Sequence, residues 1–240
     1  MSLPIFFQEG EFHVAELVQL NEDTARHVVQ VLRMSIGNKL QLTNGNGYCF
    51  DAQIVGAEKK KCQVIIEKVH FVAPKKNGLH LAVAFTKNAS RNEWLLEKAT
   101  ELGVSSIIPI IATRTEREKF RLNRWNGILT AAILQSQQYY LPQLHEPTLF
   151  KKIMEKFNAV PQKLIGHCME SIERNTLATS MKSNMETICM IGPEGDFTNE
   201  EVTLAMEKGF TGILLGEQRL RTETAAMTVC AFHNLINYEA

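Results

Sequence analysis

Apolar residues in the first 72 residues gather in short runs rich in Val, Ile, Phe and Tyr, a pattern typical of β-strands. The NGNG sequence at 44–47 separates two of these runs and is typical of a turn. Residues 21–37 differ, because an Asn21 start, helically spaced apolar residues and Gly37 as a stop indicate a helix. Several strands with one helix predict a small barrel. The expected strands are 11–17, 39–45, 48–56 and 62–72.

The pattern changes after residues 73–78, APKKNG, whose polar, proline and glycine content is typical of a linker. Short apolar runs then alternate with segments of helical periodicity, which predicts an α/β domain with a mostly parallel sheet. Trp94 and Trp125 lie on apolar helix faces and are expected in the core. The expected strands are 79–86, 105–111, 163–167, 187–191 and 213–215, and the expected helices are 92–102, 123–140, 198–209 and 222–238.

Local signals support the ends of these helices. Ser90 with Glu93, and Thr198 with Glu201, have the spacing of capping boxes. Glycines after the last helical residue allow the chain to turn away. The glycines expected to end helices are Gly103 and Gly209.

Length and composition are those of a globular protein, with 240 residues, 45% hydrophobic and 22% charged. We expect two domains, 1–72 and 73–240. No apolar run approaches the roughly 18 residues of a membrane span, and the N-terminal sequence lacks the features of a signal peptide. We therefore expect a cytoplasmic protein.

The five cysteines are scattered and form no C-x-x-C pair, so neither a disulfide framework nor a zinc site is expected. The formal net charge is zero, but residues 73–130 hold 10 basic and 5 acidic side chains. Because polyanions respond to local fields, the overall balance does not exclude RNA as a partner. A solvated charged face is the alternative interpretation.

The segment Ile191–Glu201, IGPEGDFTNEE, follows an expected strand, at the edge where open α/β sheets bind ligands. It contains neither a P-loop nor a G-x-G-x-x-G motif, and Glu194 and Asp196 would repel a phosphate. Glycines let the backbone approach a ligand closely. A nucleoside with a positive centre therefore fits better than a di- or triphosphate, and a tight strand-to-helix turn without a ligand is the alternative.

The segment Leu214–Ala226, LLGEQRLRTETAA, also follows an expected strand and leads into a helix. In an extended loop, Arg219 and Arg221 would lie on the same side. Thr222 is the expected N-cap, and the helix dipole favours Glu223 in the first turn. One acidic and one basic glycine loop at two strand ends suggest a composite site, with solvated surface arginines as the alternative.

Three stretches, IGPEGDFTNEEV, LGEQRLRTETA and EKATELGVSSIIPIIATRT, resemble the ribosomal RNA uridine-N3 methyltransferases of the SPOUT class. RHVVQVLRMSIGNKL resembles the N-terminal pattern of the same family, so the resemblance covers nearly the whole chain. It implies a PUA-like N-terminal barrel that grips RNA, a C-terminal SPOUT α/β domain with a deep trefoil knot, and a homodimer. Residue spacing does not indicate the knot, which general topology rules make improbable.

The resemblance further implies S-adenosylmethionine as methyl donor, 16S RNA of the small ribosomal subunit as substrate, and no metal. The donor carries a sulfonium cation and no phosphate, so Glu194 is acceptable beside it. Thr86 and Lys87 could approach the same pocket. The implied donor contacts are Ile191, Gly192, Pro193, Glu194, Gly195, Leu215, Gly216, Leu220 and Arg221.

Methylation at uridine N3 requires loss of the N3 proton and stabilisation of the negative charge on O2 and O4. The rigid fork of an arginine suits this task. Arg221 is the first catalytic candidate and Arg219 the second, with an RNA phosphate as the competing partner of each. No general base is assigned, because Glu223 is explained by its place at a helix start.

Basic side chains in both expected domains are candidates for contacts with RNA phosphates. Tyr139 and Tyr140 could stack on bases, with packing at a helix end as the alternative. The principal basic candidates are His27, Arg33, Lys87, Arg91 and Arg114, and the others are Lys59, Lys60, Lys61, Arg117, Lys119, Arg121 and Arg124.

The chain departs from the family pattern at four positions. Leu134, Gln137 and Gln138 stand where relatives often carry Glu, Gly and Arg, and Asp196 replaces a common glycine. Asp196 could point to solvent or tune the donor pocket. A SPOUT methyltransferase acting on another RNA, and a catalytically silent RNA-binding ribosome-assembly factor, are the alternative functions.

Overall fold

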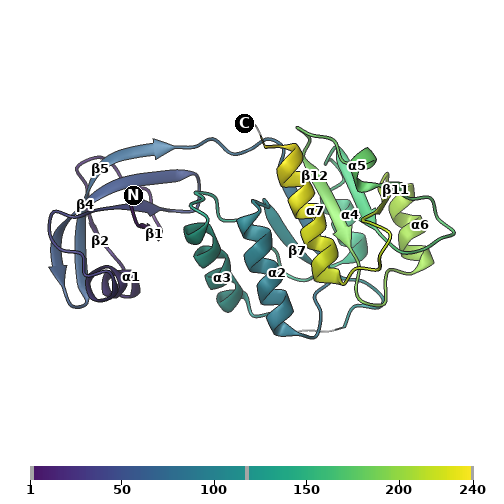
Figure 1. Ribbon diagram of the computed structural model, residues 1–240, viewed down its shortest axis with the longest axis horizontal. Helices are drawn as coiled ribbons and strands as arrows, with labels where there is room; N and C mark the ends of the chain where they lie inside the picture. Colours follow the sequence, from purple (N-terminus) through teal and green to yellow (C-terminus); the bar gives the residue numbers. More distant parts are fainter. Residues whose placement is uncertain (1–2, 117–118, 239–240) are drawn as a thin grey trace. The chain divides into compact units, whose positions relative to one another are not determined.

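The computed structural model describes residues 3–116 and 119–238 and divides into two compact units (Figure 1). The first unit consists of Met1–Pro74 with Ile133–Leu141, and the second of Lys75–Ala132 with Pro142–Ala240. The sequence did not predict that residues 133–141 belong with the first unit. Their packing depends on contacts with the NGNG turn, which lies about 90 residues earlier in the chain.

The first unit is built on a five-stranded sheet in which β1 pairs parallel with β3 and the other neighbours are antiparallel. The strands expected at 39–45, 48–56 and 62–72 are confirmed. The strand expected at 11–17 is wrong, because Ala15 has a positive φ of 68°, which extended backbone does not allow. In sheet order the strands are β1 (Ile5–Phe7), β3 (Lys39–Thr43), β4 (Tyr48–Glu58), β5 (Lys61–Phe71) and β2 (Leu17–Gln19).

One face of this sheet carries the core of the first unit. Alternate residues of a strand point to the same face, and on β3 and β4 these positions are apolar. The side chains are at most 1% exposed and comprise Leu40, Leu42, Phe50, Ala52 and Ile54.

The helix expected at 21–37 is shorter and irregular. Asn21 caps α1 (Glu22–Arg26) by accepting a hydrogen bond from the Thr24 amide at 2.8 Å, as the sequence predicts. The chain then widens into the π-helical turn η1 (His27–Val31) and leaves the helix at Arg33, whose φ is 54°. Arg33, rather than Gly37, therefore makes the left-handed turn that ends the helix.

The NGNG turn between β3 and β4 is confirmed, and it also forms a docking site for residues 139–141. The Gly47 amide donates to the Tyr139 carbonyl, and the Leu141 amide donates to the Gly45 carbonyl, each at 2.8 Å. The Tyr140 hydroxyl donates to the Val72 carbonyl at 2.7 Å. These contacts favour packing over base stacking as the role of Tyr140.

The second unit contains an eight-stranded sheet whose paired strands are all parallel, which confirms the predicted α/β class. In sheet order the strands are β11 (Asn175–Thr176), β13 (Thr211–Leu214), β10 (Gln162–Gly166), β12 (Thr187–Ile191), β6 (Leu79–Val83), β7 (Ser106–Ile111) and β8 (Gln143–Leu144), and β9 (Thr148–Leu149) pairs with β7.

Helices cover this sheet in layers (Figure 1). Apolar residues of α4 and α6 share a buried cluster with Ile188 and Met190 of β12. Cys189, between them, points to the other side, where burial, and to a smaller extent the nearby Cys230 of α7, raises the pKa of its thiol. There α2 and α7 lie side by side (Figure 1). The helices are α2 (Ala89–Glu101), α3 (Leu122–Gln135), α4 (Phe150–Lys156), α5 (Leu177–Ser180), α6 (Asn199–Glu207) and α7 (Thr222–Ile236).

The capping box expected at Ser90 and Glu93 is wrong. Asn88 is the N-cap of α2, because its side chain accepts from the Arg91 amide at 3.3 Å, and Ser90 lies inside the helix. Glu93 instead accepts two hydrogen bonds from the Arg124 guanidinium, at 2.5 and 2.8 Å. By contrast, the capping box at the start of α6 and the glycine ends of α2 and α6 are confirmed.

Three further expectations about helices are wrong. Thr222 is the first residue of α7 rather than its N-cap. The helix expected at 123–140 ends at Gln135, and Gln137 adopts a φ of 56° where relatives often carry glycine. Trp125 is 1% exposed and belongs to the core, but Trp94 is 44% exposed on α2.

Candidate active site

Loops that follow β6, β12 and β13 come together at the carboxyl edge of the parallel sheet. The Ala84 amide, after β6, donates to the Ile191 carbonyl at the end of β12, at 3.0 Å. The buried Thr222 hydroxyl donates to the Gly192 carbonyl at 3.1 Å, which joins the start of α7 to the loop after β12. The structure thus joins the two glycine-containing segments that the sequence singled out.

Glycine is required at two places in these loops for different reasons. A Cβ at Gly192 would lie 3.1 Å from two ring carbons of the buried Phe197, so a side chain there would require the Phe197 ring to shift by a few tenths of an ångström. Gly216 has a φ of 147° and open space around it, so the backbone conformation is what favours glycine there. We name residues 191–198 the donor loop, after the ligand that the sequence resemblance implies.

Arg114 fastens the donor loop to the end of β7. Its Nη1 donates to the Gly195 carbonyl at 2.7 Å and lies 3.5 Å from the Phe197 carbonyl. The neighbouring Thr113 donates through its amide and its hydroxyl to Glu201 Oε1, at 2.8 and 3.0 Å. Arg114 therefore has a structural partner in the donor loop, and its expected contact with an RNA phosphate stays a prediction.

Asp196 adopts a φ of 63°, a left-handed conformation that favours glycine, which agrees with the glycine that the family resemblance implies at this position. Its Oδ2 accepts from the Cys168 amide at 2.8 Å, and its Oδ1 accepts from the Phe197 amide at 2.8 Å. The carboxylate therefore ties the donor loop to the loop after β10. Sequence reasoning missed this link because it joins residues 28 positions apart.

Arg91, on the first turn of α2, lies between two carboxylates. Its Nη1 is 3.3 Å from Glu194 Oε1 in the donor loop, and its Nε is 3.6 Å from Glu223 Oε1 on α7. Glu223 is 9% exposed, and its Oε2 is buried without a hydrogen-bond partner among the described residues. Arg91 thus connects the donor loop with the first turn of α7.

Arg219 and Arg221 are both exposed in the loop after β13, with Arg221 immediately before α7. Within residues 3–116 and 119–238, neither guanidinium forms an ion pair or a side-chain hydrogen bond. Leu215 and Leu220 in the same loop are half-buried. The loop therefore offers two unengaged cations to a substrate.

The remaining RNA candidates are spread over the surface. His27 and Arg33 are exposed in the first unit, where the His27 ring meets the Phe6 ring edge-on at 5.8 Å. Lys87, next to the buried Thr86, pairs with Glu116 at 2.5 Å. Lys60 pairs with Glu22 at 3.2 Å. Arg117 lies outside the described residues.

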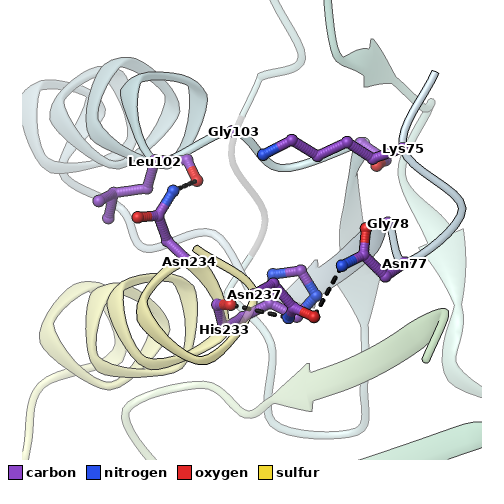
Figure 2. Close-up of a pocket in the computed structure, with 9 residues that line it drawn as sticks. Lys75, Asn77, Gly78, Leu102, Gly103, His233, Asn234 and Asn237 are labelled. Atoms are coloured by element: carbon purple, nitrogen blue, oxygen red, sulfur yellow. Dashed lines mark hydrogen bonds between the residues drawn. The ribbon is translucent and has the colours of Figure 1, made fainter. Parts of the chain in front are cut away.

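A second polar pocket lies at the opposite, amino edge of the sheet (Figure 2). Its walls are held by hydrogen bonds from Asn234 to the Leu102 carbonyl at 3.1 Å and from Asn77 to Asn237 at 2.7 Å. Its volume of about 20 Å³ has room for a single water. The pocket is too small for a nucleoside and is distinct from the candidate active site.

We expect the second unit to lose stability in weak acid, because it contains two buried histidines. Burial lowers the pKa of His233, beside this pocket, and of His167, at the end of β10, below the ordinary value of 6.5. Below that value the unfolded chain binds protons that the folded unit does not, so the free energy of unfolding should fall as pH falls. Urea denaturation between pH 7.5 and about 5.5, above most carboxyl titrations, measures the slope. The slope should shrink in a His233→Gln variant, and an unchanged slope in that variant would contradict the assignment.

Within the described part of the chain, no group of three or more His, Cys, Asp or Glu side chains could hold a metal ion. None of the helices described is long and apolar enough to cross a membrane.

One unit has a parallel sheet with the candidate active site at its carboxyl edge, and the other is a small β unit. Together they define a class of two-domain α/β proteins. A family model described as "RNA methyltransferase domain" matches residues 73–234, and one described as "RNA methyltransferase PUA domain" matches residues 20–67. The chain belongs to this family of RNA methyltransferases.

Individual relatives agree over nearly the whole chain. The "Ribosomal RNA small subunit methyltransferase E" of Synechocystis sp. is 30% identical over 91% of this chain and 73% of its own length. A methyltransferase from Legionella pneumophila, solved with bound cofactor SAM, is 30% identical with a TM-score of 0.87, covering 99% of both chains. A probable rRNA-methyltransferase from Porphyromonas gingivalis is 32% identical with a TM-score of 0.89, covering 98% of both chains.

Proposed function

We propose that this protein transfers a methyl group from S-adenosylmethionine to N3 of a specific uridine in the 16S RNA of the small ribosomal subunit. The observation that carries the proposal is the junction of the donor loop with the start of α7, where a glycine turn without a phosphate-binding motif is joined to the loop of Arg219 and Arg221, which form no ion pair within the described residues. The names of the relatives, which are ribosomal RNA small subunit methyltransferases, support the substrate. We also propose a cytoplasmic location, which an RNA substrate in the ribosome supports.

The donor loop suits a sulfonium nucleoside. Its close turn at Gly192 presents backbone groups rather than side chains, and Glu194 brings negative charge, which favours a cation. S-adenosylmethionine supplies an electrophilic methyl group when bound. The residues that we assign to donor contacts are Ile191, Gly192, Pro193, Glu194, Gly195, Leu215, Gly216, Leu220 and Arg221.

At the base, the protein must stabilise the negative charge that spreads over O2 and O4 when uridine N3 loses its proton. We assign this to Arg221, with Arg219 as the second candidate and an RNA phosphate as its competing partner, because both residues are exposed in the loop that Thr222 joins to the donor loop. His27 and Arg33 in the first unit are assigned to contacts with the RNA, together with Lys87, Arg91 and Arg114 in the second.

The knot, the domain identities and the oligomeric state are proposed from the family resemblance. The loops after β10, β12 and β13 would form the trefoil knot that the resemblance implies, and hydrogen bonds from Cys168 to Asp196 and from Thr222 to Gly192 bring these loops together. Residues 1–72 would form the PUA-like RNA-binding domain and 73–240 the SPOUT domain. The active enzyme would be a homodimer, which light scattering of the purified protein would test.

A methyl-transfer assay tests the proposed function. Purified protein is incubated with labelled S-adenosylmethionine and small ribosomal subunits that lack the modification, and the RNA is digested to nucleosides. Label in 3-methyluridine is expected. Label in another nucleoside would overturn the specificity, and absence of both label and donor binding would favour a silent RNA-binding factor.

Replacement of Arg114 by alanine is expected to weaken donor binding about tenfold, because a charge-assisted hydrogen bond of about 1.4 kcal/mol no longer holds the Gly195 carbonyl. Calorimetric titration with S-adenosylhomocysteine measures the effect. Lys119→Ala, which removes an exposed charge from the same segment, serves as the matched control. Equal affinities in the two variants would contradict the role of Arg114 in positioning the donor loop.

A further inference from the structure

An open depression lies between the first turns of α2 and α7, at the same sheet edge as the donor loop. Its volume is about 340 Å³, ample for a single nucleobase. The Arg91 guanidinium, which contacts Glu194 of the donor loop, forms part of its wall. The lining residues are Asn88, Ser90, Arg91, Trp94, Glu223 and Thr224.

Trp94 supplies the depression with an exposed aromatic face. It is 44% exposed, whereas Trp125, the other tryptophan, is 1% exposed in the core. An indole in a polar, solvent-open recess is a platform on which an unpaired base can stack, as in proteins that bind single-stranded RNA. The expected core role of Trp94 is therefore replaced by a surface role.

Glu223 supplies an acceptor that lacks a donor. The Glu223 side chain is about nine-tenths buried in the wall of the depression, and among the described residues only its Oε1 has a partner, the Arg91 Nε at 3.6 Å. A buried polar oxygen without a partner costs free energy, which a donor from a ligand would recover. Rotation about the last side-chain bond, which has a broad energy well, can bring either oxygen toward the depression.

We propose that this depression is the subsite for the target uracil, an inference that rests on the proposed function. Uracil presents a carbonyl, an N3–H and a second carbonyl along one edge. The Trp94 indole stacks on the ring, Glu223 accepts the N3–H, and Arg91 donates to an adjacent carbonyl oxygen. Cytosine offers an unprotonated N3, so the Glu223 carboxylate would face a second acceptor and reject it.

The contact between Glu223 and the uracil N3–H also supplies the general base that the sequence analysis left unassigned. Glu223 takes the N3 proton, and the electron pair left on N3 forms the bond to the methyl carbon. The bond between that carbon and sulfur breaks with its electron pair on sulfur, so S-adenosylhomocysteine and protonated Glu223 result. Arg221 then stabilises charge on the base, while Glu223 both selects and deprotonates it.

Binding of uridine and cytidine hexanucleotides, followed by tryptophan fluorescence, tests the subsite. Stacking should quench Trp94 fluorescence, and the uridine hexamer should bind about tenfold more tightly than the cytidine hexamer. Trp94→Phe should abolish the quench, and Glu223→Gln should remove the preference, because an amide can donate as well as accept. Retained preference in Glu223→Gln would overturn the proposal.

The proton-transfer role has a separate readout. Methyl transfer by Glu223→Gln should fall about 100-fold at pH 7, within the usual range for a general base. Its rate should then rise about tenfold per pH unit, because hydroxide must remove the N3 proton. Glu97→Gln is the matched control, because it removes a carboxylate of α2 that pairs with Lys98 outside the depression. This variant should retain the wild-type dependence of rate on pH.

The two proposals fail in different ways. If the wild-type protein methylates uridine while Glu223→Gln keeps its base preference and pH profile, the subsite is wrong and the function stands. If the wild-type protein prefers uridine RNA and shows the Trp94 quench but transfers no methyl group, the subsite stands and the function is wrong. Unchanged calorimetric binding of S-adenosylhomocysteine confirms that each variant is folded.

Discussion

Replacement of Arg221 by alanine is expected to lower kcat for methyl transfer by about 100- to 1,000-fold, the usual cost of removing one donor to a developing negative charge. The guanidinium is exposed and unengaged within the described part of the chain, so its removal should leave the fold intact. Donor affinity should change much less than turnover, because the donor loop is held by Thr222 and Arg114. Single-turnover kinetics and calorimetric titration with S-adenosylhomocysteine separate the two effects.

Two further variants distinguish a role of Arg221 in catalysis from a role in RNA binding. Arg219→Ala removes a charge two residues away and should mainly raise KM for RNA. Arg221→Lys keeps the charge but loses the planar fork, so it should recover only part of the activity. Equal losses of turnover and donor affinity in Arg221→Ala would refute its catalytic assignment.

Replacement of Gly47 by alanine is expected to destabilise the first unit by about 3 kcal/mol. Its φ of 87° imposes a left-handed backbone, which costs a side chain about 1 kcal/mol. A Cβ would also collide with the Tyr140 hydroxyl and lie 2.7 Å from the Val72 carbonyl, and overpacking of this kind costs about 2 kcal/mol more. The hydroxyl cannot simply move away, because it donates to that same carbonyl.

Gly37 offers the matched control, since its φ is 90° and a Cβ would meet nothing within 4 Å. Gly37→Ala should therefore lower the free energy of unfolding by only about 1 kcal/mol, the cost of placing a side chain on left-handed backbone. Calorimetry, with near-UV circular dichroism of the tyrosines, would report the unfolding of the first unit. Equal destabilisation by the two substitutions would mean that residues 139–141 do not pack on the turn.

Local sequence was sufficient wherever neighbouring residues determine the conformation. The alternation of apolar runs predicted the parallel sheet, and Thr198 and Glu201 predicted their own capping box, because both partners lie within one helical turn. The same reasoning failed at Ser90, because Asn88 two residues earlier competes for the helix start. It failed at residues 11–17 because the left-handed Ala15 leaves no local signature.

By itself, then, the sequence determined the α/β class, the two glycine loops and the family that those loops resemble, since these depend on periodicity and short motifs. Only the tertiary structure decided which charges are engaged. It brought Arg91 between Glu194 and Glu223, attached Arg114 to the Gly195 carbonyl, and left Trp94 exposed beside them. Such pairings join residues about 80 to 130 positions apart, and their geometry is set by how strands and helices pack rather than by any neighbour in the chain.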